Sequence, residues 1–195
     1  MEELKVVICD TEDLKKEAYR IRYKFYVEEI KVRDPKDYPD GLLFDKLDDT
    51  AVIFLGYSNR KPMITCRIID YREHPFEMSQ YINPEEFIKV PNCWEVTRLI
   101  ALAEARKTGL VWEFLAELNK YRIERNIRYV YHARRESQMA ESKFFNYFGS
   151  TSITEPFEYG KYGLHRIYEI DFGSETYLEN RRNREKQKIM RMEVT

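Results

Sequence analysis

The order in which β-prone runs and helical stretches alternate constrains the fold of this chain more than any other feature of its sequence. Apolar, β-branched runs suited to strands occur at residues 4–10, 49–71, 93–103, 127–134 and 165–172. Helical periodicity occurs at residues 11–29, 108–126 and 136–149. The resulting order, β-α-ββ-β-α-β-α-β, predicts the α/β (α+β) class, with a mixed central sheet and flanking helices.

Short-range signals support these elements. Thr11 is a candidate N-cap for the first helix, and Gly149 is a candidate C-cap for the third. The stretch 49–71 is a predicted hairpin that turns through Ser58–Pro62. Two prolines and a glycine mark residues 32–41 as a loop.

Composition excludes several classes of function. The formal net charge is -1 and acidic residues dilute the basic ones throughout, which argues against nucleic-acid binding. The 3 cysteines lie far apart with no C-x-x-C, which favours a reducing, cytoplasmic compartment. The 3 histidines lack metal-ligand spacing, so we expect no metal site. No apolar run is long enough to span a membrane, and no signal peptide is evident.

Neither an internal repeat nor a linker divides the chain. We therefore expect one domain over residues 1–195, with a highly charged tail at about 175–195. The charge is uneven along this domain: residues 1–104 carry 16 basic and 21 acidic side chains, whereas residues 105–195 carry 17 and 13. A basic C-terminal half favours an acidic partner, although solvated helix faces explain it nearly as well.

The stretch "CWEVTRLIALA" at residues 93–103 reads as a buried strand that contains two charges. Burying Glu95 or Arg98 without a partner would cost several kcal/mol, on the order of 3 to 5. Each charge therefore needs a partner or a chemical task. Side chains alternate along a regular strand, so Glu95 and Arg98 would point to opposite faces. They share a face only if a β-bulge lies between them.

Four short motifs accompany this strand, in a fixed order over about residues 18–109. In "YRIRYKFYVEE" Arg22 and Tyr26 are four apart, and in "FDKLDD" Asp45 and Asp48 are three apart. "TCRIID" contains Arg67, and "WEVTRL" contains Glu95, Thr97 and Arg98. Together these motifs resemble those of the acyl-homoserine-lactone synthases and the related N-acyl amino acid synthases. Both families have the GCN5-related N-acyltransferase fold, in which a splayed, bulged strand lies at the active site. The resemblance therefore implies a β-bulge near Val96–Thr97.

The resemblance implies an enzyme that joins a long-chain fatty acyl group to an amine. The lactone synthases usually carry Trp shortly after the Arg–Phe pair, at the S-adenosylmethionine end of their site, whereas this chain has Ile30, Lys31 and Val32 there. We therefore favour a bacterial, long-chain N-acyl amino acid synthase that takes its acyl group from an acyl carrier protein thioester, with tyrosine as the preferred amine. An acyl-homoserine-lactone synthase using S-adenosylmethionine is the alternative. A non-catalytic acyl-binding module is a third option.

The resemblance also assigns roles to the charged residues. Glu95 is the candidate general base, since desolvation in an apolar strand would raise the pKa of its carboxyl group toward a useful value. The plainer interpretation is a buried ion pair with Arg98 or Arg67. The polar cluster of Arg22, Tyr26, Asp45, Asp48, Arg67, Thr97 and Arg98 is expected to bind substrate and to order the 32–41 loop. One of its three arginines would hold the amino acid carboxylate, and the sequence does not distinguish among them.

The acyl donor is expected to contact the turn before the helix at 108–126. The fold carries [RQ]-x-x-G-x-[GA] there, and this chain has Arg106-x-x-Gly109-x-Val111. Free N–H groups at a helix start bind phosphate. The missing last small residue favours the single phosphate of acyl-phosphopantetheine on a carrier protein, used as a co-substrate with no permanently bound cofactor. A plain helix N-terminus is the simpler interpretation, and an acyl-enzyme on Cys93 is a minor alternative route.

Overall fold

The computed structural model describes residues 3–135 and 148–192. These residues form two compact units. The first comprises Met1–Glu77 and Glu95–Asn126, and the second comprises Met78–Trp94 and Ile127–Thr195. The expected single domain over residues 1–195 stays a prediction.

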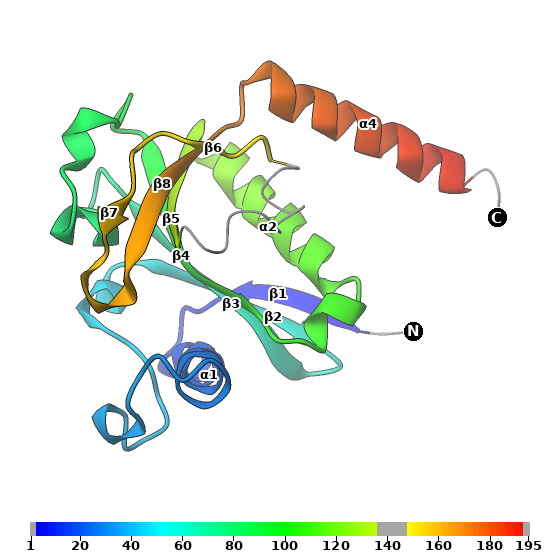
Figure 1. Ribbon diagram of the computed structural model, residues 1–195. Helices are drawn as coiled ribbons and strands as arrows, with labels where there is room; N and C mark the ends of the chain where they lie inside the picture. The colour runs from blue at the N-terminus through cyan, green and yellow to red at the C-terminus, as the bar shows by residue number, and fades with distance from the viewer. Residues whose placement is uncertain (1–2, 136–147, 193–195) are drawn as a thin grey trace. The chain divides into compact units, whose positions relative to one another are not determined.

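The first unit contains the strands β1 to β4 in spatial order β1-β2-β3-β4, together with two helices (Figure 1). Its elements are β1 (Leu4–Ile8), α1 (Glu12–Tyr23), β2 (Val52–Ser58), β3 (Lys61–Asp70), the Glu95–Ala101 part of β4 (Cys93–Ala101) and α2 (Leu110–Glu124). β2 pairs antiparallel with both β1 and β3. The strands and helices predicted here from the sequence are confirmed, with ends that differ by a few residues.

The hairpin between β2 and β3 is tighter than the sequence suggested. Ser58 pairs with Lys61, so only Asn59 and Arg60 form the loop. Both have positive φ, 49° and 64°. Two successive left-handed residues match the right-handed twist of the flanking strands, and Asn is favoured at such positions. The strands therefore continue to Ser58 and from Lys61, where a longer loop was expected.

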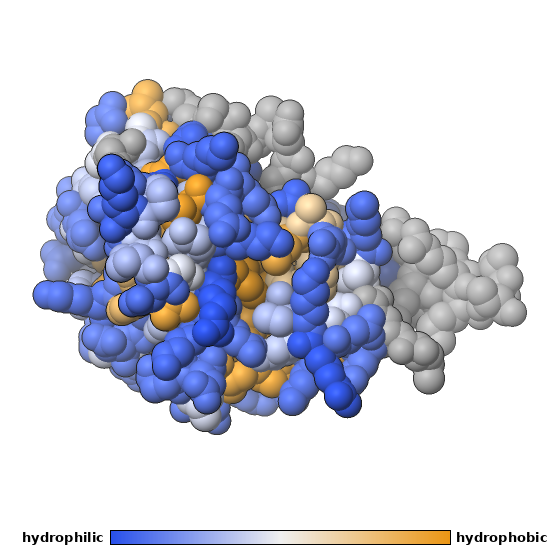
Figure 2. Space-filling view, turned by 90° about the horizontal axis from the view of Figure 1, so that it is seen from below, coloured by the Kyte–Doolittle hydropathy of each residue, from blue (hydrophilic) through white to orange (hydrophobic). Residues whose placement is uncertain are grey.

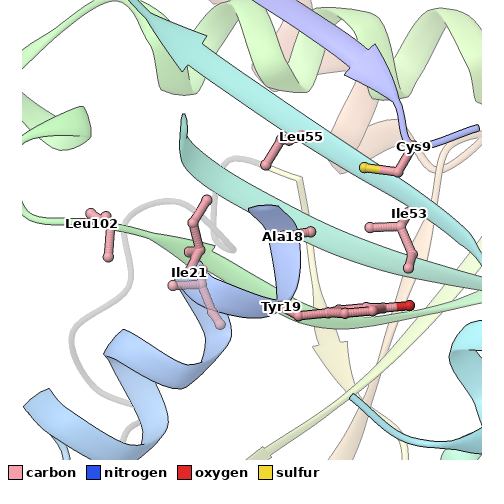
Figure 3. Packing of buried hydrophobic residues seen from close by; sticks show 8 residues of the cluster. Cys9, Ala18, Tyr19, Ile21, Ile53, Leu55 and Leu102 are labelled. Atoms are coloured by element: carbon pink, nitrogen blue, oxygen red, sulfur yellow. The ribbon is translucent and has the colours of Figure 1, made fainter. Parts of the chain in front are cut away.

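The two faces of β2 pack against different helices. Ile53 and Leu55 belong to a core cluster with Ala18, Tyr19 and Ile21 of α1 (Figure 3). Phe54 and Gly56 alternate with them and contact α2: the rings of Phe54 and Phe114 are 6.3 Å apart. A Cβ on Gly56 would come within 2.9 Å of Phe114, so only glycine lets α2 approach this closely. The helices α1 and α2 thus cover opposite faces of the sheet (Figure 1).

The sequence predicted that the first helix continues to residue 29, but α1 ends as an α-helix at Tyr23. Thr11 caps its start as expected, since its hydroxyl accepts from the Leu14 N–H at 3.4 Å. From Lys24 to Glu29 the chain forms a π-helix, with the Ile30 N–H donating to the Phe25 carbonyl. A π-turn holds one more residue than an α-turn and is common at functional sites. It changes the direction of the side chains that follow Arg22.

The second unit is built around β8 (Leu164–Asp171). β5 (Tyr129–Arg135) pairs antiparallel with β8, and the short strands β6 (Thr151–Ser152) and β7 (Phe157–Glu158) also pair with β8. The sequence predicted β5 and β8 but missed the two short strands. The charged tail expected at about 175–195 forms α4 (Glu175–Met192). Most of the helix predicted at 136–149 lies outside the described residues.

The visible surface is mainly hydrophilic, with hydrophobic side chains showing between the polar ones (Figure 2). Large hydrophobic side chains that remain exposed include Phe44, Trp112 and Ile123. No helix in residues 3–135 and 148–192 combines the length and the apolar character needed to cross a membrane.

Candidate active site

Six charged side chains of the first unit meet between α1 and the sheet, and we call them the arginine cluster. They are Arg22 of α1, Asp45 and Asp48 of a 3₁₀ turn, Arg67 of β3, Glu77 at the start of a second 3₁₀ turn, and Arg98 of β4. Five of the six were candidate substrate-binding residues in the sequence. The structure therefore brings together residues that span 76 positions of the chain, from 22 to 98.

Arg67 is at the centre of the cluster and is completely buried. Its Nη1 lies 2.6 Å from Asp45 and 3.2 Å from Asp48, and its Nη2 lies 2.7 Å from Glu77. Its Nε donates to the Thr97 hydroxyl at 2.9 Å. Every nitrogen of the guanidinium therefore has a partner, which a buried charge requires.

Asp45 and Asp48 face the same side because they cap one 3₁₀ turn, Lys46–Asp49. The Asp45 carboxylate accepts from the Leu47 N–H, and the Asp48 carboxylate accepts from the Asp45 N–H. This capping box aims both side chains at Arg67. Burial opposes ionisation of Asp45, but the guanidiniums of Arg67 and Arg98 outweigh it and hold the pKa of this carboxyl below its ordinary value.

Arg22 reaches the cluster only through Asp48, at 2.8 Å from its Nη1. Its side chain has no exposed area. Within the described residues, its Nε and Nη2 have no hydrogen-bond partner. The Tyr19 ring lies 5.2 Å from the guanidinium carbon. In this conformation Arg22 supports the 3₁₀ turn of Asp48 and is shielded from solvent.

Arg98 contacts both sides of the cluster. Its Nη2 lies 3.1 Å from Asp45 and 2.8 Å from Glu77. The Tyr26 ring, presented by the π-helix, lies 5.6 Å from its guanidinium carbon. Burial opposes this charge, but Glu77, Tyr26 and Asp45 outweigh burial and raise the pKa of the guanidinium. Arg98 therefore stays charged and remains 13% exposed, whereas the side chains of Arg22 and Arg67 have no exposed area.

Strand β4 is interrupted at Arg98, whose φ is 52°. Thr97 meets Arg67, so Thr97 faces α1, and by alternation Glu95 does as well. Beyond the interruption, Ile100 and Leu102 belong to the core cluster on the α1 side. The alternation of faces therefore shifts by one residue between Thr97 and Arg98, as in a β-bulge. The backbone irregularity lies at Arg98, one residue after the Val96–Thr97 pair where the resemblance placed a bulge.

Glu95 is completely buried, and its carboxylate accepts a hydrogen bond from the Glu77 N–H at 2.5 Å. Arg98 donates to the carboxylate of that same Glu77. Glu95 and Arg98 are thus held by one residue on one side of the sheet, which a regular strand would not allow. A carboxylate anchored beside a charged guanidinium is able to accept a proton from an amine while an anionic group binds nearby.

Glu77 was missed by the sequence analysis, which treated residues 73–92 as irregular. The signal that could have indicated Glu77 is the balance of positive and negative charges in the cluster. Arg22, Arg67 and Arg98 were all expected in the cluster, with only Asp45 and Asp48 to neutralise them if Glu95 acts as a base. One more acid was needed, and "EHPFEMSQ" offered it. Glu77 supplies that third carboxylate.

The expected phosphopantetheine turn precedes α2. Gly109 is the N-cap of α2 with φ of -72°, and a Cβ there would meet Leu4 at 3.5 Å. Neither the backbone nor packing therefore demands glycine at this position, which leaves its role in admitting a ligand as a prediction. The Thr108 hydroxyl already accepts from the Leu110 N–H. Arg106 donates to the Ala101 carbonyl at 3.2 Å and is exposed.

Other expectations concern groups around the cluster. No three His, Cys, Asp or Glu side chains of the described residues converge in a way that would hold a metal ion. Asp45 and Asp48, two acids of the "FDKLDD" motif that accept from backbone amides of their own turn, both bind Arg67. Cys93 is a free, completely buried thiol.

Comparison with known proteins supports the fold. No protein-family model matches the sequence, and no curated protein sequence matches it either. Solved structures, in contrast, do match this chain. The CoA-dependent acyl-homoserine lactone synthase BjaI, solved with SAM and isopentyl-CoA, has a TM-score of 0.69 and 19% identity over 94% of this chain and 89% of its own. The AHL synthase LasI has a TM-score of 0.67 and 15% identity, over 90% and 92%.

FeeM, an N-acyl amino acid synthase from uncultured soil microbes, has a TM-score of 0.67 and 15% identity over 88% of this chain and 92% of its own. At such identities the likeness concerns the fold. The resemblance drawn from four short motifs is thus confirmed at that level. The chain has the α/β fold of the acyl-homoserine-lactone synthases and the N-acyl amino acid synthases, the GCN5-related N-acyltransferase fold.

Proposed function

We propose that this protein is an N-acyltransferase that joins a long-chain fatty acyl group, carried as a thioester, to the amino group of an amino acid. The observation that carries the proposal is the pairing of Glu95 and Arg98 on one side of β4. The interruption at Arg98 creates this pairing, and Glu77 holds both residues. The shared fold with acyltransferases supports the same reaction class.

In the proposed reaction, the substrate amine loses a proton to Glu95, directly or through a water, and attacks the thioester carbonyl. A C–N bond forms, the C–S bond breaks, and the thiol leaves with a proton. Glu95 suits the base role because burial keeps competing water away and the Glu77 N–H fixes the direction of its carboxylate.

Arg98 is the best of the three arginines for the carboxylate of the amino acid. Arg67 uses every nitrogen on cluster partners, and Arg22 is completely enclosed. Arg98 retains some exposure, and its Nε has no hydrogen-bond partner among the described residues. A buried donor without a partner gains by binding an anion. Tyr26, against the Arg98 guanidinium, would then border the amine pocket, and tyrosine remains our preferred amine.

We propose an acyl carrier protein as the donor, with Arg106 and Gly109 near its phosphopantetheine. The basic candidates for docking this acidic partner include Lys120 and Arg125 of the α2 region. Arg125 is exposed, and its guanidinium carbon lies 3.5 Å from the Tyr121 ring centroid. Such surface charges mainly raise the association rate and are sensitive to salt. BjaI is described as CoA-dependent, so acyl-CoA is the donor to compare.

A lactone synthase is the second candidate, because BjaI was solved with SAM and has this fold. Both candidates form an amide on an amine, but the second uses S-adenosylmethionine as that amine and also closes a lactone ring. Mass spectrometry of an organic extract of the purified protein and of its expressing cells separates them. N-acyl tyrosine or another N-acyl amino acid is the expected product. An acyl-homoserine lactone would favour the second candidate. With carrier protein and amines supplied, no acylated product at all would contradict both and leave an acyl-binding module.

A further inference from the structure

We propose that Glu77 positions both halves of the catalytic pair: its backbone N–H fixes the Glu95 carboxylate and its side chain fixes the Arg98 guanidinium. This inference rests on the proposed function, in which Glu95 is the base and Arg98 holds the substrate carboxylate. The backbone N–H and the side-chain carboxylate of Glu77 thus have separate tasks. No sequence motif had indicated this residue.

The contacts of Glu77 are the first support. Its Oε1 lies 2.8 Å from Arg98 Nη2, its Oε2 lies 2.7 Å from Arg67 Nη2, and its N–H donates to Glu95 Oε2 at 2.5 Å. The side chain is only 13% exposed, so these charge-assisted bonds form with little competition from water. Because Arg67 is itself held by Asp45, Asp48 and Thr97, Glu77 ties Arg98 to a rigid group.

The place of Glu77 in the chain is the second support. The flanking residues Phe76 and Met78 are buried, and the Phe76 ring packs 5.0 Å from the Tyr71 ring. Packing on both sides therefore holds the backbone at residue 77, so its N–H stays directed at Glu95 without help from its own side chain. The Glu77 carboxylate therefore binds Arg98 and Arg67 and is not needed to orient its own N–H.

The chain path makes this N–H significant. The first unit is left after Glu77 and entered again at Glu95. The Glu77–Glu95 hydrogen bond therefore closes a connection of 17 intervening residues at its two ends. The base and its donor are fixed to each other where the chain leaves and re-enters the same unit, which keeps the Glu95 carboxylate in one orientation.

Three substitutions separate the two tasks. Glu77→Gln keeps the shape and removes the charge, and Glu77→Ala removes the contacts with both arginines. Glu77→Pro removes the side-chain contacts and also the N–H. Because residue 77 is the first residue of a 3₁₀ turn, proline there removes no hydrogen bond within the turn itself. Glu73→Ala is the matched control, since Glu73 is an exposed acid four residues before Glu77, after the end of β3.

The expected kinetic pattern is a split between KM and kcat. Glu77→Ala raises the KM for the amino acid about 100-fold because Arg98 is no longer held, and Glu77→Gln raises it about 10-fold. Glu77→Pro lowers kcat about 10-fold beyond the value for Glu77→Ala, because Glu95 loses its donor. The KM for the acyl thioester stays unchanged in all three, and Glu73→Ala matches the wild type. A purely structural role would lower the amount of folded enzyme and leave the KM for the amino acid unchanged.

A structural readout needs no turnover. In ¹H–¹⁵N NMR spectra of the full chain, Glu95→Gln should move the amide proton of residue 77 upfield, since a neutral acceptor replaces a charged one. An unmoved amide proton would overturn the contact on which the inference stands. The positioning role would be overturned by an unchanged KM for the amino acid in Glu77→Ala, or by equal kcat values in Glu77→Ala and Glu77→Pro. In either case the proposed function would still stand if the wild-type enzyme transfers the acyl group. Absence of transfer in the wild type would instead overturn the proposed function, and the positioning role with it.

Discussion

Two buried regions of the first unit share the same elements and differ in chemistry. The apolar core cluster uses Ile21 of α1 and Ile53 of β2, whereas the arginine cluster begins at the next residue of α1, Arg22. The core is held by non-directional packing, so its members are interchangeable within their volume. The arginine cluster is held by directed bonds between charges that cannot be left unpaired. The apolar core thus tolerates substitutions that conserve volume, whereas the arginine cluster does not tolerate the loss of a charged partner. The proposed chemistry lies in the arginine cluster.

The largest effect on stability should come from Arg67→Ala. It would leave Asp48 and Glu77, which are nearly enclosed, and the partly exposed Asp45 without their shared partner. We expect the free energy of unfolding to fall by about 3 to 5 kcal/mol. Urea titration followed by circular dichroism measures this change. A loss of under about 1 kcal/mol, the range of an exposed ion pair, would mean that the cluster is not rigidly paired.

Leu55→Ala gives the matching value for the apolar region. Leu55 is completely buried between α1 and the sheet, so its truncation leaves a cavity. The expected loss is about 2 to 5 kcal/mol. Leu55→Met, which conserves volume, should cost less than about 1.5 kcal/mol. If Leu55→Met proved as costly as Leu55→Ala in the same titration, the contrast between a tolerant core and a brittle cluster would fail.

Asp45→Asn should show a pH-dependent loss. Because the pKa of Asp45 is lowered by folding, its contribution is fully present above the unfolded pKa of about 3.9 and is lost as the pH falls through the folded pKa. The side chain is 37% exposed, so solvent screening limits the effect to about 1 kcal/mol. Asn keeps the N-cap of the 3₁₀ turn. Unfolding measured at pH 6 and pH 3 should show a larger wild-type advantage at pH 6 than at pH 3, and an equal advantage at both would contradict the assignment.

Tyr26→Leu should have the smallest effect. It removes the ring that lies 5.6 Å from the Arg98 guanidinium and keeps an apolar side chain. The expected cost is about 0.5 to 1 kcal/mol, whereas Tyr26→Phe should cost less because the ring remains. Thermal unfolding of both variants provides the check. Equal melting temperatures would show that Arg98 does not depend on this ring.

The sequence predicted what depends on local pattern. Strand alternation and helical periodicity located most elements, and the spacing of Asp45 and Asp48 on one turn was correct. The positive φ of Arg98 lies one residue after the Val96–Thr97 pair, where the resemblance placed a bulge. These successes have one origin: each uses the geometry of a single element.

The remaining features depend on contacts between elements. Glu77 joins the cluster through a segment without periodicity, and the π-helix at Lys24–Glu29 follows from packing rather than propensity. Which arginine stays accessible was also undetermined, since Arg22, Arg67 and Arg98 look alike in the sequence. Only the burial of Arg22 and the full set of partners on Arg67 separate them from Arg98.

The central claim is that Glu95 is the base of an acyl transfer to an amine, and Glu95→Gln tests it most directly. The measurement is the kcat of purified protein with an acyl thioester and the amine identified from the extract, together with the melting temperature. Gln keeps the shape and an acceptor for the Glu77 N–H, so folding should be preserved. We predict a fall in kcat of about 10²- to 10⁴-fold at an unchanged melting temperature. Wild-type kcat in this variant would contradict the account and leave Glu95 a structural member of the site.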